Sequence, residues 1–398
     1  MKNICSFILN ENKFLNLEKL FESTILFKSI ISRQLSILEK AGCFSHLIIH
    51  DDIETIAKYD IDNLTCLCDN DFAADFIKGF DLVIISHGDM PLIESEIIKD
   101  AINCHKDGSI TVLTNYDRII KSDCEGSIFI LDSKLFNKFL LSSSDIYDFA
   151  KEHKKLTIIE ADTSFCARIF DNLSLMEIKE AARQKTLYSH CENGVIFEAF
   201  DGVIIDDDSI IEEGATILPG TIIKGNSYIK SGAVIGPNSN ITDTIIGNFS
   251  EIKATYCEKS SIGDNVKIGP FCNIRPDCKI SDNVKMGDFV EIKNSQIGEN
   301  TAVAHLTYVG DSDVGSGVNF GCGTVTVNYD GINKHRTKIG NNVFIGCNTN
   351  FIAPVEIEDN TFIAAGSTIT KDVPEGAFAI ARARQENKPD YAKKFLKK

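Results

Sequence analysis

The sequence lacks several features that mark well-defined classes of protein. It has no tryptophan and only 8 prolines among 398 residues, so proline-rich linkers are absent. No apolar run approaches the roughly 20 residues that a membrane-spanning helix needs. The N-terminal stretch MKNICSFILNENK becomes polar too soon for a signal peptide. We therefore expect a cytoplasmic protein that has no membrane partner.

Positive charge is also scarce. The chain has 41 Lys and Arg residues against 57 Asp and Glu residues, which gives a net charge of −16. Sequence-independent binding of DNA or RNA needs a cationic surface against the phosphates, so we expect no nucleic-acid partner. Hydrophobic residues make up 43% of the chain, which is enough to build buried cores and too much for a disordered protein.

The 13 cysteines show no spacing that suits a metal site or a disulfide framework. None forms a C-x-x-C pair, and Cys66 and Cys68 have the closest spacing. An odd count without an export signal favours reduced thiols that pack as small apolar residues. The sequence therefore gives no support for a structural zinc site.

A large side chain recurs every six residues through most of the second half, with one-residue slips of the register. An amphipathic helix would repeat at 3.6 residues and a strand at 2, whereas a period of six is typical of hexapeptide β-helix repeats. Of 27 such positions, 26 are large and apolar, and the exception is Thr326. The 26 apolar positions are Ile205, Ile211, Ile217, Ile223, Ile229, Ile235, Ile241, Ile246, Ile252, Ile262, Ile268, Ile274, Ile280, Met286, Ile292, Ile297, Val303, Val309, Val314, Phe320, Ile339, Ile345, Phe351, Ile357, Ile363 and Ile369.

Each hexad predicts one short strand and one corner, with its large side chain pointing inward. Three hexads close a triangular coil, so 27 positions predict about nine stacked coils around a continuous core. Two stretches interrupt the period, Lys253–Ser261 and Val327–Lys338. We expect both stretches to project from the stack as loops, where binding residues often lie.

The first 200 residues alternate between apolar runs and helical patterns, which predicts an α/β domain with a mostly parallel sheet. The predicted strands are Ile4–Leu9, His46–Ile49, Asp81–Ile85, Thr111–Leu113 and Ser127–Leu131. The predicted helices are Ser29–Ala41, Glu94–Asn103, Ser133–Leu141 and Ser174–Thr186. We therefore expect an α/β domain over 1–173, a helical linker over 174–200, a β-helix over 201–381 and a basic tail over 382–398.

Four motifs of the repeat array occur in a fixed order. They are GPFCNIRP at 269–276, GDFVEIKN at 287–294, AHLTYVGD at 304–311 and NFGCGTVTVNYDG at 319–331, and FIGCNTNFIAPV, AAGSTIT and ARARQ follow. This run strongly resembles the acetyltransferase half of the bifunctional enzymes that make UDP-N-acetylglucosamine. The resemblance implies a left-handed parallel β-helix that acetylates glucosamine-1-phosphate with acetyl-CoA. It also implies a homotrimer whose sites lie between neighbouring solenoids.

Forming an amide from a thioester needs a base for the amine proton and donors for the thioester oxygen. The chain has eight His residues, and His305 lies inside the repeat array in AHLTY. The resemblance implies that His305 is the general base and that Glu291, in FVEIK, orients its imidazole. It also implies substrate contacts, with Arg275 and Lys293 suited to the sugar phosphate. The further substrate positions are Tyr308, Asn319, Asn328 and Tyr329.

The family positions that bind acetyl-CoA fall on Cys322, Cys347, Ala365 and Arg382. Cys322 stands where the family has alanine and Cys347 where it has serine, and both are small enough for a narrow pantetheine groove. Residues 382–398 contain seven Lys and Arg and two acidic residues. Such a tail suits the coenzyme phosphates, although a merely solubilising terminus fits its residues beyond Arg384 equally well.

The first half keeps the outline of the family's nucleotidyltransferase-like (Rossmann-like) domain but not its chemistry. HGDMPLI at 87–93 resembles the segment whose Asp holds Mg²⁺, which points to Asp89. The glycine-rich phosphate loop is replaced by ILNENKFLNLEK, with no glycine and with Lys13 as the one cation between Leu9 and Phe14. The second metal ligand would fall at Phe170 or Asp171. We expect Asp89 to be a vestigial carboxylate and Mg²⁺ to be needed only if this domain is active.

The favoured function is glucosamine-1-phosphate N-acetyltransfer with His305 as general base. One alternative is a bifunctional enzyme that also transfers UMP from UTP to N-acetylglucosamine-1-phosphate. A second is a catalytically inactive trimeric scaffold, and a third is acetyl transfer to a different amino sugar. The sequence leaves the present role of the first domain open.

Overall fold

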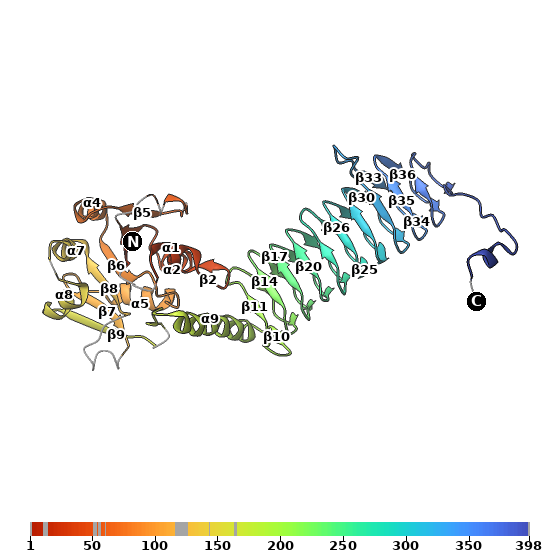
Figure 1. Ribbon diagram of the computed structural model, residues 1–398. Helices are drawn as coiled ribbons and strands as arrows, with labels where there is room; N and C mark the ends of the chain where they lie inside the picture. Colours follow the sequence, from red (N-terminus) through yellow and green to blue (C-terminus); the bar gives the residue numbers. More distant parts are fainter. Residues whose placement is uncertain are drawn as a thin grey trace. The chain divides into compact units, whose positions relative to one another are not determined.

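The computed structural model describes residues 2–10, 15–50, 54, 57–59, 61–115, 126–142, 144–162 and 165–396. The chain divides into two compact units, Met1–Lys185 and Thr186–Lys398 (Figure 1). The division falls within helix α9 (Asn172–Glu192), which therefore contributes residues to both units. No helix in the described part of the chain is both long and apolar enough to cross a membrane.

The first unit is built on a seven-stranded sheet in the order β5-β4-β1-β6-β8-β7-β9. Strand β8 runs antiparallel to β6 and β7, and the other neighbours are parallel. The strands are β1 (Ile4–Leu9), β4 (His46–Ile49), β5 (Leu64–Leu67), β6 (Leu82–His87), β7 (Ile110–Thr114), β8 (Ile128–Asp132) and β9 (Leu156–Glu160). A small hairpin, β2 (Thr24–Ile25) and β3 (Lys28–Ser29), lies outside this sheet.

Helices cover both faces of this sheet, which explains why its central strands are almost continuously apolar. One core cluster joins the sheet to residues of α2 and α5, and the other joins it to residues of α4, α7 and α8. Besides the first part of α9, the helices in the described part of the unit are α1 (Leu17–Glu22), α2 (Ile30–Lys40), α4 (Asn70–Phe76), the 3₁₀ helix η1 (Ile77–Gly79), α5 (Ser95–Cys104), α7 (Ser133–Leu140) and α8 (Ile146–Glu152). The predicted mostly parallel α/β class is therefore confirmed.

The second unit is a left-handed parallel β-helix with three faces (Figure 1). Face 1 consists of β10 (Ile196–Phe197), β13 (Thr216–Ile217), β16 (Val234–Ile235), β19 (Glu251–Ile252), β22 (Lys267–Ile268), β25 (Lys285–Asp288), β28 (Ala302–His305), β31 (Asn319–Phe320), β34 (Phe344–Ile345), β37 (Phe362–Ile363) and β39 (Phe378–Ala379). Face 2 consists of β11 (Ile204–Ile205), β14 (Ile222–Lys224), β17 (Asn240–Thr242), β20 (Tyr256–Glu258), β23 (Asn273–Ile274), β26 (Glu291–Lys293), β29 (Tyr308–Gly310), β32 (Val325–Val327), β35 (Asn350–Ile352) and β38 (Thr368–Ile369). Face 3 consists of β12 (Ile210–Ile211), β15 (Tyr228–Ile229), β18 (Ile245–Ile246), β21 (Ser261–Ile262), β24 (Lys279–Ile280), β27 (Gln296–Ile297), β30 (Ser312–Val314), β33 (Thr337–Ile339) and β36 (Val355–Ile357).

All 27 positions of the six-residue period are buried, as predicted. The polar exception, Thr326, is also buried, and its hydroxyl has hydrogen-bond partners. The hydroxyl accepts from the backbone N–H of Gly310 at 2.8 Å and donates to the carbonyl of Gly310 at 3.2 Å. A buried hydroxyl that forms such hydrogen bonds costs little in an otherwise apolar core.

The prediction that Lys253–Ser261 projects as a loop is wrong. This stretch contains β20, which pairs with β17 on one side and β23 on the other, and Cys257 points into the core. Ile252, Cys257 and Ile262 follow one another at five-residue steps, so two corners are each one residue shorter than usual. The period was missed here because the inward residue is a small thiol rather than a large aliphatic side chain.

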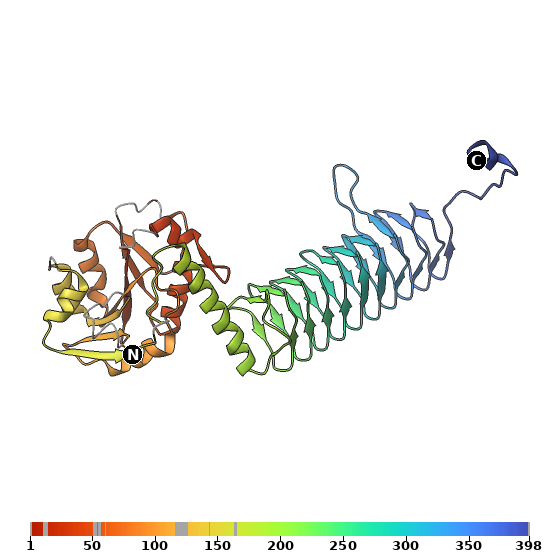
Figure 2. The same ribbon diagram turned by 60° about the horizontal axis from the view of Figure 1, so that its bottom comes forward.

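The second interruption does project, but over fewer residues than predicted. Strand β32 ends at Val327 and β33 begins at Thr337, which leaves 328–336 as a loop outside the coils (Figure 2). Tyr329 and Lys334 form an antiparallel bridge within it. The loop is therefore an ordered hairpin-like projection from one corner of the stack.

Candidate functional site

The predicted catalytic histidine lies at one corner of the β-helix, which we name the 1–2 corner because the chain passes there from face 1 to face 2. His305 is the last residue of β28, and Asp288 is the last residue of β25, directly opposite it in the parallel register. The backbone N–H of Leu306 donates to the carbonyl of Asp288 at 3.1 Å. The two side chains therefore extend from equivalent positions of adjacent coils.

His305 and Asp288 are hydrogen bonded through Nδ1 and Oδ1 at 2.5 Å. The imidazole of His305 is 57% exposed, so its Nε2 edge is accessible. The hydrogen bond from His305 holds the pKa of Asp288 below its ordinary value, so this carboxylate is charged near neutral pH. A charged carboxylate at Nδ1 favours the tautomer in which Nδ1 carries the proton and Nε2 accepts one.

The predicted pairing of Glu291 with His305 is wrong. The Oε1 atom of Glu291 accepts a hydrogen bond from Nη1 of Arg275 at 2.9 Å, whereas His305 pairs with Asp288. The physical reason is the register: Glu291 lies on face 2, and the residue one coil after it is Tyr308. Glu291 is therefore placed to orient the guanidinium of Arg275.

The 1–2 corner continues past His305 through three of the positions predicted to bind the coenzyme. Gly323, next to Cys322, donates to the carbonyl of His305 at 3.4 Å, Asn348 donates to Cys322 at 2.8 Å and Gly366 donates to Cys347 at 2.8 Å. Neighbouring parallel strands lie about 4.8 Å apart, so His305, Cys322, Cys347 and Ala365 form a column with one residue per coil. Cys347 and Ala365 are exposed and Cys322 is partly buried.

Glycines keep this column narrow. A Cβ atom on Gly321 would lie 2.5 Å from the backbone nitrogen of Cys347, and one on Gly346 would lie 2.4 Å from that of Ala365. Neither position has space for a side chain, so the coils pack closely at this corner. The fourth predicted coenzyme residue, Arg382, is exposed, and its Cδ lies 3.5 Å from the place where a Cβ of Gly366 would be. Arg382 thus lies at the far end of the same column.

Three of the predicted substrate residues share face 2. Lys293 and Tyr308 are on adjacent strands β26 and β29, and Arg275 directly follows β23. Asn319 is different, because it lies on face 1, beside Ala302 on one coil and Phe344 on the next. The structure therefore brings Arg275, Lys293 and Tyr308 onto one surface and places Asn319 on the other side of the 1–2 corner.

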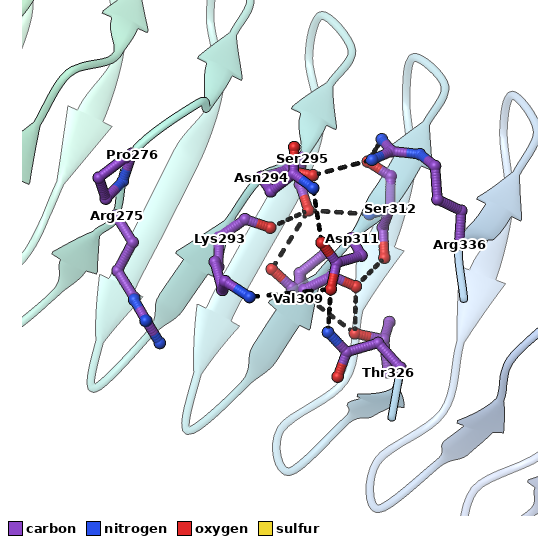
Figure 3. A network of polar contacts seen from close by, with 12 residues as sticks. Arg275, Pro276, Lys293, Asn294, Ser295, Val309, Asp311, Ser312, Thr326 and Arg336 are labelled. Carbon is purple, nitrogen blue, oxygen red and sulfur yellow. Dashed lines mark hydrogen bonds and ion pairs between the residues drawn. The ribbon is translucent and has the colours of Figure 1, made fainter. Parts of the chain in front are cut away.

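Asp311 organises the region around Lys293 (Figure 3). Its buried carboxylate lies 3.9 Å from the amine of Lys293, and it accepts from the amide of Asn294 at 2.6 Å and from the amide of Asn328. Burial alone would raise the pKa of Asp311, but these two hydrogen bonds and the charges of Lys293 and Lys334 hold it below its ordinary value. A charged Asp311 therefore fixes both Lys293 and Asn328.

Two amines lie close together at this point. The pKa of Lys293 is lowered, first by its hydrogen bond with Lys334 and then by partial burial, although Asp311 acts in the opposite direction. Two neighbouring ammonium groups repel each other, and an anion between them would relieve that repulsion. This pair makes the surface suitable for a phosphate group.

The projecting loop presents the two remaining predicted residues. Asn328 is buried at its base and also donates to the hydroxyl of Tyr308 at 3.4 Å, whereas Tyr329 is exposed. Arg336 holds the end of the loop, because its guanidinium donates to the carbonyls of Asn294 and Ser312 at 3.1 Å each and pairs with Asp313. The loop is thus attached to the coil that carries Lys293.

The structure does not bring the predicted metal ligands of the first unit together as a metal site. Asp89 is buried and accepts bidentate hydrogen bonds from Arg168. Phe170 has no metal-binding atom, and Asp171 accepts from the backbone N–H of Ser174 at 2.8 Å, which makes it the N-terminal cap of α9. Among the residues that the structure describes, no three His, Cys, Asp or Glu side chains come together to hold a metal ion. The predicted gap in the phosphate loop, residues 11–14 with Lys13, lies outside the described residues.

Sequence reasoning missed Asp288, Asp311, Lys334 and Arg168. Asp288 could have been predicted from the sequence, because residues one coil apart face each other. The step from Met286 to Val303 shows that this coil has 17 residues, which places Asp288 opposite His305. Asp311 has the same signal, because Asn294 lies one coil before it. Lys334 and Arg168 have no comparable signal, since Lys334 lies on the projecting loop and Arg168 is far in sequence from its partner Asp89.

A family model agrees with the repeat array of the second unit. The family model described as "Bacterial transferase hexapeptide (six repeats)" matches residues 259–294 and 336–371. A nucleotidyl transferase from Methanothermobacter thermautotroptrophicus superimposes on 46% of this chain and 98% of its own, with 10% identity and a TM-score of 0.37.

Curated relatives match a larger part of the sequence. The bifunctional protein GlmU of Clostridium novyi is 42% identical over 82% of this chain and 81% of its own. Those of Thermoanaerobacter pseudethanolicus and Caldanaerobacter subterraneus are 41% and 40% identical, with the same coverage. The second unit holds little more than half of the chain, so a match of this length also includes part of the first unit. The chain therefore belongs to the family of the bifunctional protein GlmU.

Proposed function

We propose that this chain transfers the acetyl group of acetyl-CoA to the amine of glucosamine-1-phosphate, giving N-acetylglucosamine-1-phosphate. The observation that carries the proposal is the position of the Asp288–His305 pair. It lies where the column of Cys322, Cys347 and Ala365 meets the cationic surface of face 2. A thioester that follows the column and a sugar phosphate held on face 2 would both reach His305.

The chemistry follows from the hydrogen bond at Nδ1. The substrate amine attacks the thioester carbonyl carbon while Nε2 of His305 accepts one of its protons. The carbon–sulfur bond then breaks, and the coenzyme thiolate leaves with the proton that His305 returns, so the products are the amide and the free thiol. Asp288 stabilises the imidazolium that forms between these two events.

The acceptor is assigned from the charges on face 2. Arg275 offers a fork of N–H donors, and Glu291 holds it in place at 2.9 Å. Lys293 and Lys334 supply two further positive charges beside it. Within a chain of net charge −16, this concentration of cations suits a small phosphorylated substrate. Tyr308, Asn319, Asn328 and Tyr329 are proposed to contact the sugar or the coenzyme.

The coenzyme and the assembly complete the proposal. The narrow column at the 1–2 corner suits the pantetheine arm, and Arg382 at its end, with the basic residues that follow, suits the phosphates. Lys397 and Lys398, at the end of this tail, lie outside the described residues. We further propose a homotrimer, because exposed Phe271, Phe289 and Leu306 line the 1–2 corner beside His305 and suit burial against another copy.

A thiol-release assay tests the function. Purified full-length protein is given acetyl-CoA and glucosamine-1-phosphate, and the free coenzyme thiol is measured over time. Turnover with this acceptor, and much weaker turnover with glucosamine, glucosamine-6-phosphate and other amino sugars, supports the proposal. An absence of thiol release with every acceptor would favour the inactive scaffold. Faster turnover with another amino sugar would identify that sugar as the acceptor in place of glucosamine-1-phosphate.

A second activity is a separate question, because the relatives carry the name bifunctional. The buried, arginine-paired Asp89 argues against UMP transfer by this chain. We expect no pyrophosphate release from UTP, N-acetylglucosamine-1-phosphate and Mg²⁺ under conditions in which acetyl transfer is easily measured. Pyrophosphate release that Asp89→Asn abolishes would establish the bifunctional alternative.

A further inference from the structure

Asp89 lies at the carboxyl end of the central strand β6, the edge at which α/β sheets bind their ligands. Its carboxylate is 1% exposed, and the side chain of Arg168 is 8% exposed. Arg168 donates from Nε to Oδ1 at 2.9 Å and from Nη2 to Oδ2 at 3.0 Å. The guanidinium therefore engages both oxygens of Asp89 in the fork arrangement that Arg favours.

Other side chains close the same edge. Gln34, from α2, donates to the carbonyl of His87 at 2.7 Å and to the hydroxyl of Ser86 at 3.0 Å. His87 is hydrogen bonded through Nε2 to the hydroxyl of Tyr147, from α8, at 2.5 Å. Residues 82–93 are all buried. Asp89 is thus enclosed by protein groups instead of facing a cleft.

A divalent cation does not fit this arrangement. Mg²⁺ needs close, near-octahedral oxygen ligands and usually keeps several waters, which a carboxylate enclosed in this way cannot offer. A cation at Asp89 would also lie beside the fixed positive charge of Arg168. The expected second ligand is missing as well, because Phe170 has no donor atom and Asp171 caps α9.

We propose that Arg168 takes the place of the metal ion at Asp89, so that the first unit is held together by an internal cation and is independent of divalent metals. The pair joins the end of β6 to the segment that leads into α9, since Arg168 precedes the α9 cap Asp171 by three residues. A site that would hold a metal and a nucleotide has become a clasp between the sheet and α9. This inference concerns the first unit and does not depend on the acetyl transfer proposed for the second.

Manganese binding provides the first test. Free Mn²⁺ is measured by electron paramagnetic resonance while MnCl₂ is added to the full-length wild-type chain and to Asp89→Asn. The acidic surface will bind some Mn²⁺ weakly, so the difference between the two proteins is the informative quantity. We expect no difference, and no change in the unfolding temperature with Mn²⁺ or with EDTA. A site that the wild type has and Asp89→Asn lacks would overturn the proposal.

A double-mutant cycle provides the second test and asks whether the pair acts as a clasp. Arg168→Leu and Asp89→Leu each leave a buried charge without its partner, so each should lower the unfolding temperature of the first unit by roughly 10 °C. The double variant should lose clearly less than the two single losses combined. Lys99→Leu, which removes an exposed ion pair with Glu96 on α5, is the control in the same unit and should have little effect. Additive losses in the cycle would contradict the clasp, and the manganese measurement stands even if a single variant does not fold.

Discussion

His305 and Asp288 show how the proposed catalytic pair arises from two residues that are 17 positions apart in the sequence. Each occupies the same corner of its own coil, so the hydrogen bond between them depends on the stacking of the coils. The sequence motifs predict functional roles for His305, Arg275 and Lys293. They do not identify the partner of His305, because that choice requires the exact register of β25 and β28.

The first prediction concerns this pair. His305→Ala should lower acetyl transfer by about 10²–10⁴-fold, the contribution expected of a general base, with the fold unchanged. Asp288→Asn should lower it by about 10–100-fold, because the imidazole loses its charged orienting partner. Steady-state thiol release measures both, and Glu299→Gln, an exposed carboxylate away from the pair, is the control. If Glu291→Gln shifts the acidic limb of the pH–rate profile and Asp288→Asn does not, then Glu291 and not Asp288 is the carboxylate that orients the imidazole of His305.

The second prediction concerns the acid sensitivity of the projecting loop. Asp330 accepts from the backbone N–H groups of Asn333 and Ile332 and pairs with His335, and these contacts lower its pKa to about 2. A carboxylate with a lowered pKa stabilises the folded loop above its ordinary pKa of about 4, and this stability is lost as the pH falls towards 2. Hydrogen-exchange mass spectrometry should therefore show protection of 328–336 that is constant from pH 7 to 5 and falls between pH 4 and 2. Protection that stays unchanged down to pH 2 would show that the Asp330 carboxylate does not hold this loop.

Among the structural elements, the coil around Cys257 marks the limit of reading a period from a sequence. The six-residue repeat predicted three faces and 27 inward positions, all of which are buried. It failed between Ile252 and Ile262, where a small thiol fills the core and the corners are short. In a stacked core, a smaller inward side chain can be combined with a shorter corner. A search for large apolar residues at a fixed spacing detects neither change.

The elements of the first unit divide in the same way. The five predicted strands and three of the four predicted helices lie within two residues of their expected bounds, because long apolar runs and strong helical periods specify them. The fourth helix was predicted over Ser174–Thr186, and α9 extends further, to Glu192. Strands β5 and β9 and helices α1, α4 and α8 were not predicted. They have four to seven residues each, and β9 is only partly buried, with an alternating pattern that a short loop also shows. Their structure depends on the sheet edge and on the neighbouring helices.

The third prediction belongs to the stacked coils. A Cβ atom on Gly247 would lie 2.3 Å from the carbonyl oxygen of Gly263 in the next coil, which is backbone and cannot rotate away. Gly247→Ala should therefore lower the free energy of unfolding of the second unit by about 1–3 kcal/mol, the usual cost of overpacking. Gly79→Ala, with nothing within 4 Å of the new methyl group, is the control in the other unit. Urea unfolding measures both, and equal stability of the two variants would show that the coils can move apart at no cost.

At the scale of the whole molecule, each unit has a core of its own. One continuous cluster runs from Leu187 to Val373, and two separate clusters lie within the first unit. The residues assigned to acetyl transfer begin at Arg275, well inside the second unit. Nothing in the proposed chemistry therefore requires the first unit.

The fourth prediction follows from this independence. A fragment of residues 186–398 should fold, form trimers and release thiol from acetyl-CoA at a rate within a few-fold of the full chain. Analytical ultracentrifugation and the thiol assay measure the two properties. A trimeric but inactive fragment would show that the first unit contributes to the site, and an unfolded fragment would show that the solenoid needs it for stability.

The corner column has one more consequence, which concerns lengths. Asp288, His305, Cys322, Cys347 and Ala365 come from five successive coils, one residue from each, so the coil pitch of about 4.8 Å sets every spacing along the column. The number of coils between two of these residues therefore fixes the distance between them. Gaining or losing one whole coil before β22 would leave all the spacings along the column unchanged. The same change between His305 and Ala365 would keep the fold but would displace the thioester by one coil pitch. That displacement is enough to separate the thioester from the base.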